Sequence, residues 1–226
     1  MNTIRSERVQ KMLERLHQNG RNDVFRALSW IPPRVSEFFQ PERLTHSEGV
    51  AKRAKILRDS FLGITKQQGD LLYTMVRLKR PELVIEFGAS MGISTLYLSS
   101  ALQDNGHGKM ITTELEPDKC ERVRKHLEEA GLQKLVEIRA GDARETLKDT
   151  DEDVDFLFLD GWKSLYLPVF SILEENLRPG AMILADDTRK KLREIGPFLT
   201  YMLNPNNGYV TVDLNVGHGM SLSVRT

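Results

Sequence analysis

The chain of 226 residues is poor in several features, and each scarcity excludes a class of protein. A single cysteine, Cys120, excludes an internal disulfide and favours a reducing compartment. The 32 Lys and Arg balance the 32 Asp and Glu, so no global positive field draws the chain to nucleic acid or to an anionic membrane. No apolar run approaches the roughly 20 residues that cross a bilayer, and the first residues lack the apolar stretch of a secretion signal. We therefore expect a soluble, cytoplasmic protein.

The length suits one domain with a sizeable core and an added helical segment. Residues 1–62 are rich in charge and show no strand-like alternation. They predict an N-terminal segment of helices broken at Gly20, at Pro32-Pro33 and at Pro41. This segment could be a substrate lid, a dimer contact or a cover for the core. Residues 63–226 form the predicted main domain.

Strand and helix patterns alternate through the main domain. A capping box, Thr65-Lys-Gln-Gln68, predicts a helix that begins there and ends near Arg80. Further helices are expected near Gly92–Gln103, Pro117–Ala130, Ala143–Asp149, Lys163–Leu177 and Thr188–Leu203. Strands are expected near Leu83–Phe87, Lys109–Thr113, Leu135–Arg139, Val154–Leu159, Ala181–Ala185, Tyr209–Leu214 and Met220–Val224. The pattern predicts an α/β fold with a doubly wound, mostly parallel sheet of seven strands, whose last two strands form an antiparallel hairpin.

The stretch from Leu83 to Thr95 predicts a buried strand, a tight turn and a helix N-terminus. Gly88 and Gly92 let a ligand approach the backbone, and the open N–H groups of the helix start favour an anionic group. Ser90 stands where the dinucleotide fingerprint has its middle glycine, which disfavours a pyrophosphate. An adenosine ligand that carries a carboxylate fits better, and Glu114 after the next strand is placed to bind ribose. The alternative is a purely structural strand-turn-helix.

Acidic residues follow the fourth and fifth predicted strands. Asp160 follows the fourth, and Asp186 and Asp187 follow the fifth. If these strands are neighbours, the three carboxylates converge at the carboxyl edge of the sheet, where a hard cation would compensate their charge. Mg²⁺, Mn²⁺ or Ca²⁺ fits such oxygen ligands better than zinc. The alternative is that the acids cap helices or face water.

Two further residues have two readings each. Lys163, close after Asp160, is either a charge-balancing residue or a proton acceptor. Asp142, in Gly141-Asp-Ala143, either caps the next helix or contacts an adenine, and capping is the stronger default.

These motifs occur in the order found in a known family. From about Thr65 to Arg225 the chain resembles the class I S-adenosylmethionine-dependent O-methyltransferases of the catechol and caffeoyl-CoA type. The stretches that carry the resemblance are Glu86-Phe-Gly-Ala-Ser-Met-Gly-Ile-Ser94, Thr113-Glu-Leu-Glu-Pro117, Gly141-Asp-Ala143, Asp160-Gly-Trp-Lys163 and Ala185-Asp-Asp-Thr188. The last of these departs from the family's usual Asp-Asn, because Asp187 stands in place of the asparagine.

The resemblance implies a metal-dependent methyl transfer from S-adenosylmethionine to a hydroxyl of a catechol-like or other vicinal-oxygen molecule. It implies that Ser94 binds the methionine carboxylate, that Glu114 binds the ribose, and that Lys163 is the catalytic base. Asp160, Asp186 and Asp187 would hold the cation, with Mg²⁺ favoured over Mn²⁺ or Ca²⁺. The full set of expected cofactor-binding residues is Glu86, Gly88, Ala89, Ser90, Ser94, Glu114, Leu115, Asp142, Ala143 and Asp160.

The expected partners are a hydroxylated small molecule and a second copy of the chain in a homodimer, with no membrane. A second reading is a tRNA hydroxyl methyltransferase of the same fold. The neutral net charge argues against it, while the basic run Arg189-Lys-Lys-Leu-Arg193 could supply a local patch. A non-catalytic binding protein is the third reading, and the intact set of acidic residues and Lys163 argues against it.

Overall fold

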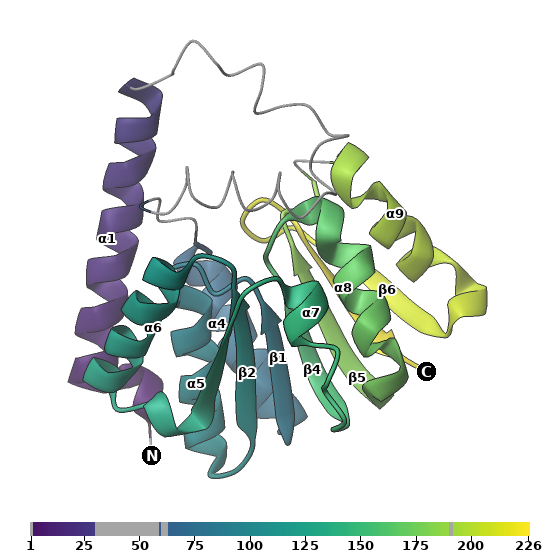
Figure 1. Cartoon of the computed structure of the whole chain (residues 1–226), viewed down its shortest axis with the longest axis horizontal. Coiled ribbons are helices and arrows are strands. Elements are labelled where there is room, and N and C mark those ends of the chain that lie inside the picture. The colour runs from purple at the N-terminus through teal and green to yellow at the C-terminus, as the bar shows by residue number, and fades with distance from the viewer. Residues whose placement is uncertain (1, 30–58, 60–62, 190–191) are drawn as a thin grey trace.

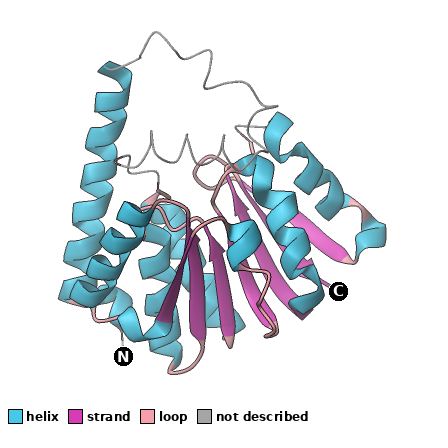
Figure 2. Cartoon of the chain, in the orientation of Figure 1, coloured by secondary structure: helices cyan, strands magenta, loops and turns pink. Residues whose placement is uncertain are grey.

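The computed structural model describes residues 2–29, 59, 63–189 and 192–226, and these form one sheet with helices on both sides (Figure 1, Figure 2). The sheet has seven strands in the order β3-β2-β1-β4-β5-β7-β6. The strands are β1 Leu83–Phe87, β2 Lys109–Glu114, β3 Val136–Ala140, β4 Val154–Leu159, β5 Leu177–Asp186, β6 Tyr209–Leu214 and β7 Met220–Arg225. The five strands β1 to β5 run parallel to one another, and β7 pairs antiparallel with both β5 and β6. The predicted fold class is confirmed.

The helices fall into two layers. They are α1 Glu7–Ser29, α4 Lys66–Lys79, α5 Ile93–Asn105, α6 Pro117–Ala130, α7 Ala143–Thr146, α8 Tyr166–Leu173 and α9 Leu192–Leu203. Short 3₁₀ turns are η1 Thr3–Arg5, η3 Gln133–Leu135, η4 Lys163–Leu165, η5 Glu174–Asn176 and η6 Pro205–Asn207. Side chains of α1, α4, α5 and α6 build one hydrophobic cluster, and side chains of α7, α8 and α9 build a second. Both faces of β1 and β4 are buried between these clusters, which explains their uninterrupted apolar runs.

The capping box at the start of α4 is confirmed. The Thr65 hydroxyl accepts from the Gln68 backbone N–H, and the Gln68 side chain accepts from the Thr65 backbone N–H. Pro117 opens α6, and Gly131 ends it in the left-handed conformation, as expected.

The predicted helix break at Gly20 is wrong. α1 continues through this residue from Glu7 to Ser29. One glycine costs a helix only about 1 kcal/mol relative to alanine, and packing offsets that cost. Four buried side chains of the first half of α1 lie in the same hydrophobic cluster as α5 and α6, so this part of the helix covers the core; they are Val9, Met12, Leu13 and Leu16. Pro32, Pro33 and Pro41 lie outside the described residues.

Three predicted helices are too long. The helix expected over 188–203 is observed from Leu192, and Thr188 and Arg189 lie in a turn. The helix expected over 143–149 ends at Thr146, and the helix expected over 163–177 divides into η4, α8 and η5. β5 takes residue 177, so it begins four residues before its predicted start. The Arg178-Pro179-Gly180 stretch looks like a turn, but the register of β5 with β4 shifts there and Gly180 takes a positive φ of 78°. A β-bulge of this kind allows both Pro179 and Gly180 to lie within a strand.

The strand order reverses between β1 and β4. β1 leads outward to β2 and β3, whereas β4 leads the other way to β5. In open sheets of this kind, ligands bind beyond the carboxyl ends of the strands at this point. Gly88 follows β1 and Glu114 ends β2 on one side of this point, and Asp160 follows β4 and Asp186 ends β5 on the other. No helix among the described residues has the length and apolar character to cross a membrane.

Candidate functional site

A buried lysine lies among the three predicted metal-binding acids. Lys163 begins η4, and its ammonium lies 3.3 Å from Asp160 Oδ1 and 3.6 Å from Asp187 Oδ2. Its side chain is 7% exposed, against 15% for Asp160 and 27% for Asp187. Asp186 ends β5 beside them and is 5% exposed. We call Asp160, Lys163, Asp186 and Asp187 the carboxylate cluster.

Two neutral side chains donate or accept hydrogen bonds within the carboxylate cluster. Lys163 Nζ donates to the Tyr166 hydroxyl at 2.6 Å, and that hydroxyl donates to the backbone oxygen of Asp186 at 3.2 Å. The Gln68 amide, from α4, donates to Asp186 Oδ1. Tyr166 is fully buried, and its hydroxyl contacts Lys163. The spacing of three residues within one helical turn is the signal in the sequence that could have found this contact.

Burial raises the pKa of Asp160 and of Asp186, and the neighbouring carboxylates raise both further. Burial lowers the pKa of Lys163, but the Tyr166 oxygen and the carboxylates of Asp160 and Asp187 outweigh it, so the pKa of this lysine stands above its ordinary value. Burial keeps the pKa of Tyr166 well above its usual range, so its hydroxyl is neutral. In this state Lys163 is an ammonium ion and not yet a base.

The donor chemistry of the carboxylate cluster fits a hard divalent cation. Asp160 and Asp187 pair with the single ammonium, and Asp186 adds a third carboxylate beside them, so their formal charge is balanced only in part. All three offer oxygen ligands. Within residues 2–29, 59, 63–189 and 192–226, however, no group of three His, Cys, Asp or Glu side chains is arranged to hold a metal ion. Lys163 instead takes part of the space between the carboxylates.

Asp187 occupies a turn position with a left-handed φ of 57°. Asp and Asn are the side chains that tolerate this conformation best. The asparagine that the resemblance leads us to expect here would fit the same backbone, so Asp187 differs from it only by its charge.

The turn of residues 88–92, called here the glycine turn, lies across the switch point from the carboxylate cluster. Gly88 has a φ of 97°, and a Cβ there would lie 2.7 Å from Gly161 Cα. Position 88 therefore requires glycine partly because the backbone of Gly161, in the loop after β4, packs against it, whether or not a ligand is bound. Gly92 caps α5 with a φ of 83° and supplies no side-chain cap, which leaves the first N–H groups of this helix open to an anionic ligand.

Glu114, at the end of β2, is held in place by backbone donors. Ser90 N donates to Oε2 at 2.8 Å and Glu116 N donates to Oε1 at 2.9 Å. Burial raises the pKa of its carboxyl, although these donors lower it. Each oxygen retains a second lone-pair direction, so a ribose hydroxyl can still donate to it.

The other predicted cofactor residues differ in accessibility. Side chains that are 0–4% exposed are those of Glu86, Ala89, Ser94 and Ala143, whereas Gly88, Ser90, Leu115, Asp142 and Asp160 are partly exposed. Glu86 lies beneath the glycine turn, where Oε2 accepts from the hydroxyls of Thr95 and Thr112 at 2.6 Å each. Asp142 caps α7 through Arg144 N at 2.9 Å and pairs with the Arg144 guanidinium, so its capping role is confirmed.

Cys120 is buried, and burial raises the pKa of its thiol to about 11, as expected of a residue without a chemical role.

Comparison with known proteins identifies the family. Residues 85–188 match a family model described as a methyltransferase domain. Catechol O-methyltransferase from Sus scrofa is 31% identical over 137 residues, which cover 58% of this chain and 73% of that protein. The chain belongs to the class I O-methyltransferases.

Other members of this O-methyltransferase family match over a smaller share of their length. Catechol O-methyltransferase from Mus musculus is 34% identical over 56% of this chain and 49% of its own. Caffeoyl-CoA O-methyltransferase from Stellaria longipes is 25% identical over 66% of this chain and 63% of its own. The alignments thus span about half to three quarters of the lengths of these curated relatives.

Solved O-methyltransferase structures share the fold over nearly the whole chain. An O-methyltransferase from Bacillus cereus in complex with SAH has a TM-score of 0.68 and 22% identity, and covers 93% of this chain and 100% of its own. The O-methyltransferase TomG from Streptomyces achromogenes, in complex with SAM, has the same TM-score and identity and covers 93% and 98%.

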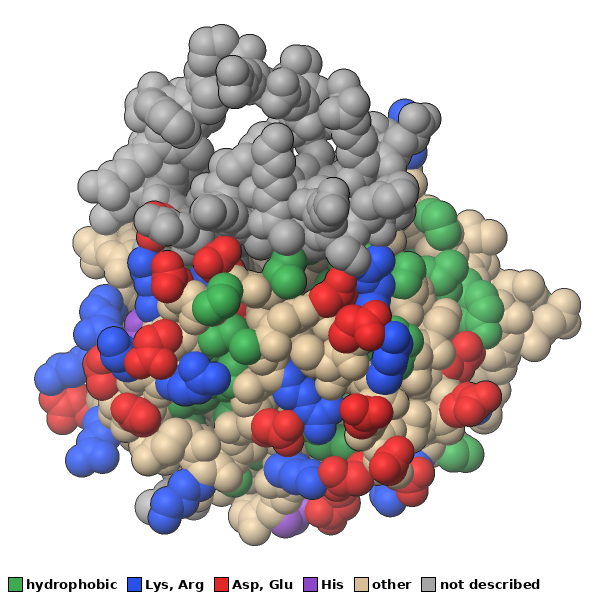
Figure 3. All heavy atoms as spheres, viewed as in Figure 1, with side chains coloured by type: hydrophobic (Ala, Val, Ile, Leu, Met, Phe, Trp, Pro, Cys, Tyr) green, Lys and Arg blue, Asp and Glu red, His purple; other side chains and the backbone are tan. Residues whose placement is uncertain are grey.

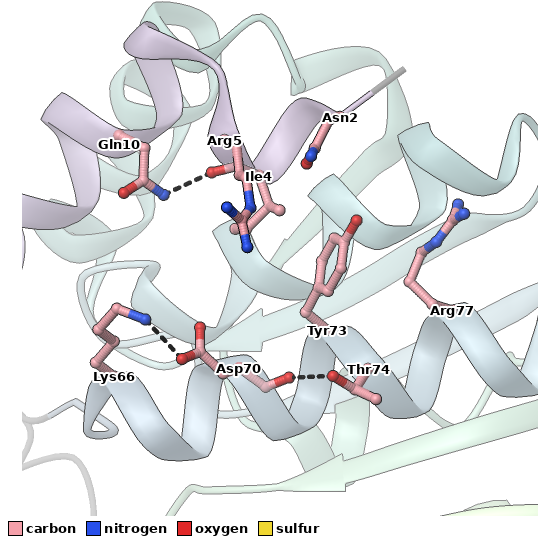
Figure 4. Close-up of a pocket in the computed structure, with 9 residues that line it drawn as sticks. All are labelled: Asn2, Ile4, Arg5, Gln10, Lys66, Asp70, Tyr73, Thr74 and Arg77. Atoms are coloured by element: carbon pink, nitrogen blue, oxygen red, sulfur yellow. Dashed lines mark hydrogen bonds and ion pairs between the residues drawn. The ribbon is translucent and has the colours of Figure 1, made fainter.

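A groove and a basic run lie outside the site of this O-methyltransferase. The groove, of about 870 Å³, lies between η1 and α4 and is lined by residues such as Arg5, Asp70 and Tyr73 (Figure 4). In the basic run, Arg189 is paired with Asp213 at 2.7 Å, while Lys190 and Lys191 lie outside the described residues. On the face shown in Figure 3, basic and acidic side chains are interspersed rather than gathered by sign. None of these features favours the tRNA reading.

Proposed function

We propose that this chain moves the methyl group of S-adenosylmethionine to a hydroxyl of a catechol-like or other vicinal-oxygen small molecule, with the help of a divalent cation. The observation that carries the proposal is the placement of the carboxylate cluster and the glycine turn on either side of the switch point. One half supplies an acceptor for a ribose and a helix start for a carboxylate. The other supplies hard oxygen ligands and a lysine.

The cofactor would lie across the glycine turn. The uncapped start of α5 and the Ser94 hydroxyl would bind the methionine carboxylate, and Glu114 would bind the ribose hydroxyls. Asp142 and Ala143 would border the adenine, and Leu115 would add apolar contact. Because Glu86 is fully buried, its part is to support the turn from below rather than to reach the cofactor.

Asp160, Asp186 and Asp187 would hold the cation, for which Mg²⁺ is the first candidate and Mn²⁺ or Ca²⁺ the next. When bound, such a cation supplies charge that binds vicinal oxygens and lowers the pKa of the hydroxyl to be methylated. The same charge would compensate the carboxylates that now hold the proton on Lys163. Lys163 would then accept the hydroxyl proton, while Tyr166 keeps its Nζ in place.

Positioning two bound reactants in line is the remaining contribution, and it is worth several kcal/mol and up to roughly 10. The direct test is a methylation assay with labelled S-adenosylmethionine against catechols, caffeoyl esters and unmodified tRNA. Transfer to a vicinal diol that requires Mg²⁺ supports the proposal. Transfer to tRNA alone overturns its substrate class.

We further propose a homodimer. Among the described residues the sheet ends at β6, where Val210 is 62% and Val212 is 49% exposed. An unpaired edge with apolar side chains is a surface that a second copy would cover. Light scattering at several concentrations tests this proposal, and a strictly monomeric mass would contradict it.

A further inference from the structure

A glutamine from the first turn of α4 reaches into the carboxylate cluster. Gln68 lies 118 residues before Asp186 in the chain, yet its amide Nε2 donates to Asp186 Oδ1. Both side chains are buried, at 1% exposure for Gln68 and 5% for Asp186. A buried hydrogen bond to a carboxylate restricts the position of that carboxylate strongly, because water cannot take its place.

The capping box sets the direction of this amide. Gln68 Oε1 accepts from Thr65 N at 2.8 Å and from the Thr65 hydroxyl at 2.9 Å. A flipped amide would turn its oxygen towards the Asp186 carboxylate and its NH₂ group towards the Thr65 N–H. Both contacts would then be repulsive, so Nε2 must face Asp186.

The loop between β6 and β7 closes the other side of Gln68. Gly217 has a φ of 59°, and a Cβ there would overlap the Gln68 amide. Gln68 is therefore confined by its own helix start, by this loop and by Asp186. On the far side of Asp186, its backbone oxygen accepts from Tyr166, which in turn accepts from Lys163. A hydrogen-bonded chain thus connects α4 with the lysine.

We propose that Gln68 is a positioning residue for the cation site, which holds the Asp186 carboxylate in the orientation that binds the metal. The inference rests on the proposed function, since it concerns the cation expected at Asp160, Asp186 and Asp187. Groups that orient a metal ligand through a hydrogen bond typically change metal affinity 10- to 100-fold when they are removed.

The experiment measures Mn²⁺ binding by calorimetry in the full chain without substrate, together with S-adenosylmethionine binding and the midpoint of thermal unfolding. Gln68→Met removes the donor to Asp186 and one half of the capping box. Thr65→Ala is the matched control, because it weakens the other half and leaves the amide beside Asp186. Gln68→Asn, which keeps an amide that is too short to reach, is the second variant in case the first fails to fold.

We expect the Gln68 variants to bind Mn²⁺ 10- to 100-fold more weakly, while Thr65→Ala stays within threefold of the wild type and all variants bind S-adenosylmethionine normally. Equal losses in Thr65→Ala and Gln68→Met would mean that the helix start alone matters, and wild-type affinity in a folded Gln68 variant would also overturn the inference. If the wild type binds no Mn²⁺, the cation of the proposed function fails first, and that result is visible before any variant is compared.

Discussion

The two halves of the site hold their acids by opposite means. In the glycine-turn half, Glu86 receives two hydroxyl donors, and Glu114 receives two backbone N–H groups. In the carboxylate cluster, Asp160 and Asp187 share one ammonium ion. The acids of the first half are held by neutral donors that folding has already fixed, although Glu86 Oε1 has no hydrogen-bond partner among the described residues. The second carries more negative charge than its own lysine balances.

This difference suggests which half depends on an added ion. Neutral donors hold a carboxylate in place without an ion from solution. A buried excess of like charge is costly until a counterion compensates it. We therefore expect substitutions that change shape or hydrogen bonding in the glycine-turn half to alter stability and cofactor binding. We expect the function of the carboxylate cluster to depend on the presence of a cation.

Removal of the cation is expected to have the largest effect. EDTA should abolish methyl transfer, and Mg²⁺ or Mn²⁺ in excess should restore it, because the charge of Asp160, Asp186 and Asp187 is otherwise uncompensated. S-adenosylmethionine binding, measured in the same chelator by calorimetry, should persist. Full activity in EDTA, or in the Asp160→Ala variant, would contradict the expectation that the carboxylate cluster depends on a cation.

Replacement of Lys163 should come next. Lys163→Ala should lower kcat by about 10²–10⁴ through loss of the proton acceptor, with cofactor affinity nearly unchanged. Lys163→Arg should not rescue, since a guanidinium ion does not release its proton in this range. An arginine variant with most of the wild-type kcat would show that the residue acts only as a fixed positive charge.

The glycine turn should respond to shape. Gly88→Ala should lower the free energy of unfolding by about 2–5 kcal/mol, from the positive φ and from contact with the backbone of Gly161. Gly106→Ala is the matched control, because Gly106 also has a positive φ, of 78°, but no atom within 4 Å of a Cβ. It should lose only about 1–2 kcal/mol. If urea titrations gave the two variants equal losses in the free energy of unfolding, the close approach of Gly88 to Gly161 would be unimportant for stability.

A smaller effect is expected at Glu114. Glu114→Ala should weaken S-adenosylmethionine binding by about 1–3 kcal/mol, as a paired ribose contact is lost. Glu116→Ala, two residues along the chain, removes the same charge without the contact and should bind normally. Unchanged affinity in the Glu114 variant would refute the ribose assignment.

An effect on stability alone should appear as a pH dependence at Glu86. Burial raises the pKa of this carboxyl, so the folded protein binds its proton more tightly than the unfolded chain. Its contribution to stability is then full below the unfolded pKa of about 4.3 and is lost as the pH rises through the folded pKa. Glu86→Gln should gain stability relative to the wild type from pH 4 towards neutrality, by about 1.4 kcal/mol for each unit of the shift. Parallel stability curves for the two proteins would contradict this.

Local patterns in the sequence were sufficient for most of the fold. The apolar runs of β1 and β4 and the caps of α4 and α6 are visible within a few residues, because each depends on neighbours in the chain. The bulge in β5 was missed, since Pro179 and Gly180 look like a turn until a neighbouring strand accommodates them. The continuity of α1 through Gly20 depends on packing, which a local pattern does not contain.

The site was predictable only in part, for a similar reason. The positions of Asp160, Asp186 and Glu114 follow from the rule that parallel strands end at one edge of the sheet. The contact of Gln68 with Asp186 joins residues 118 apart, and the capping box that reveals Gln68 gives no hint of it. The protonation of Lys163 depends on the distance to each carboxylate, which no spacing along the chain specifies.

The position of β7 has a consequence for how the protein is made. β7 comes after every other described strand in the chain, yet it lies inside the sheet between β5 and β6, where Met220 pairs with Asp186. On the ribosome, which delivers chains from the N-terminus, the earlier strands can assemble while Asp186 still lacks its neighbour. The carboxylate cluster can therefore reach its final form only after β7 has been made, and a ribosome that stalls before residue 220 would leave a nascent chain with an open sheet and an unfinished site.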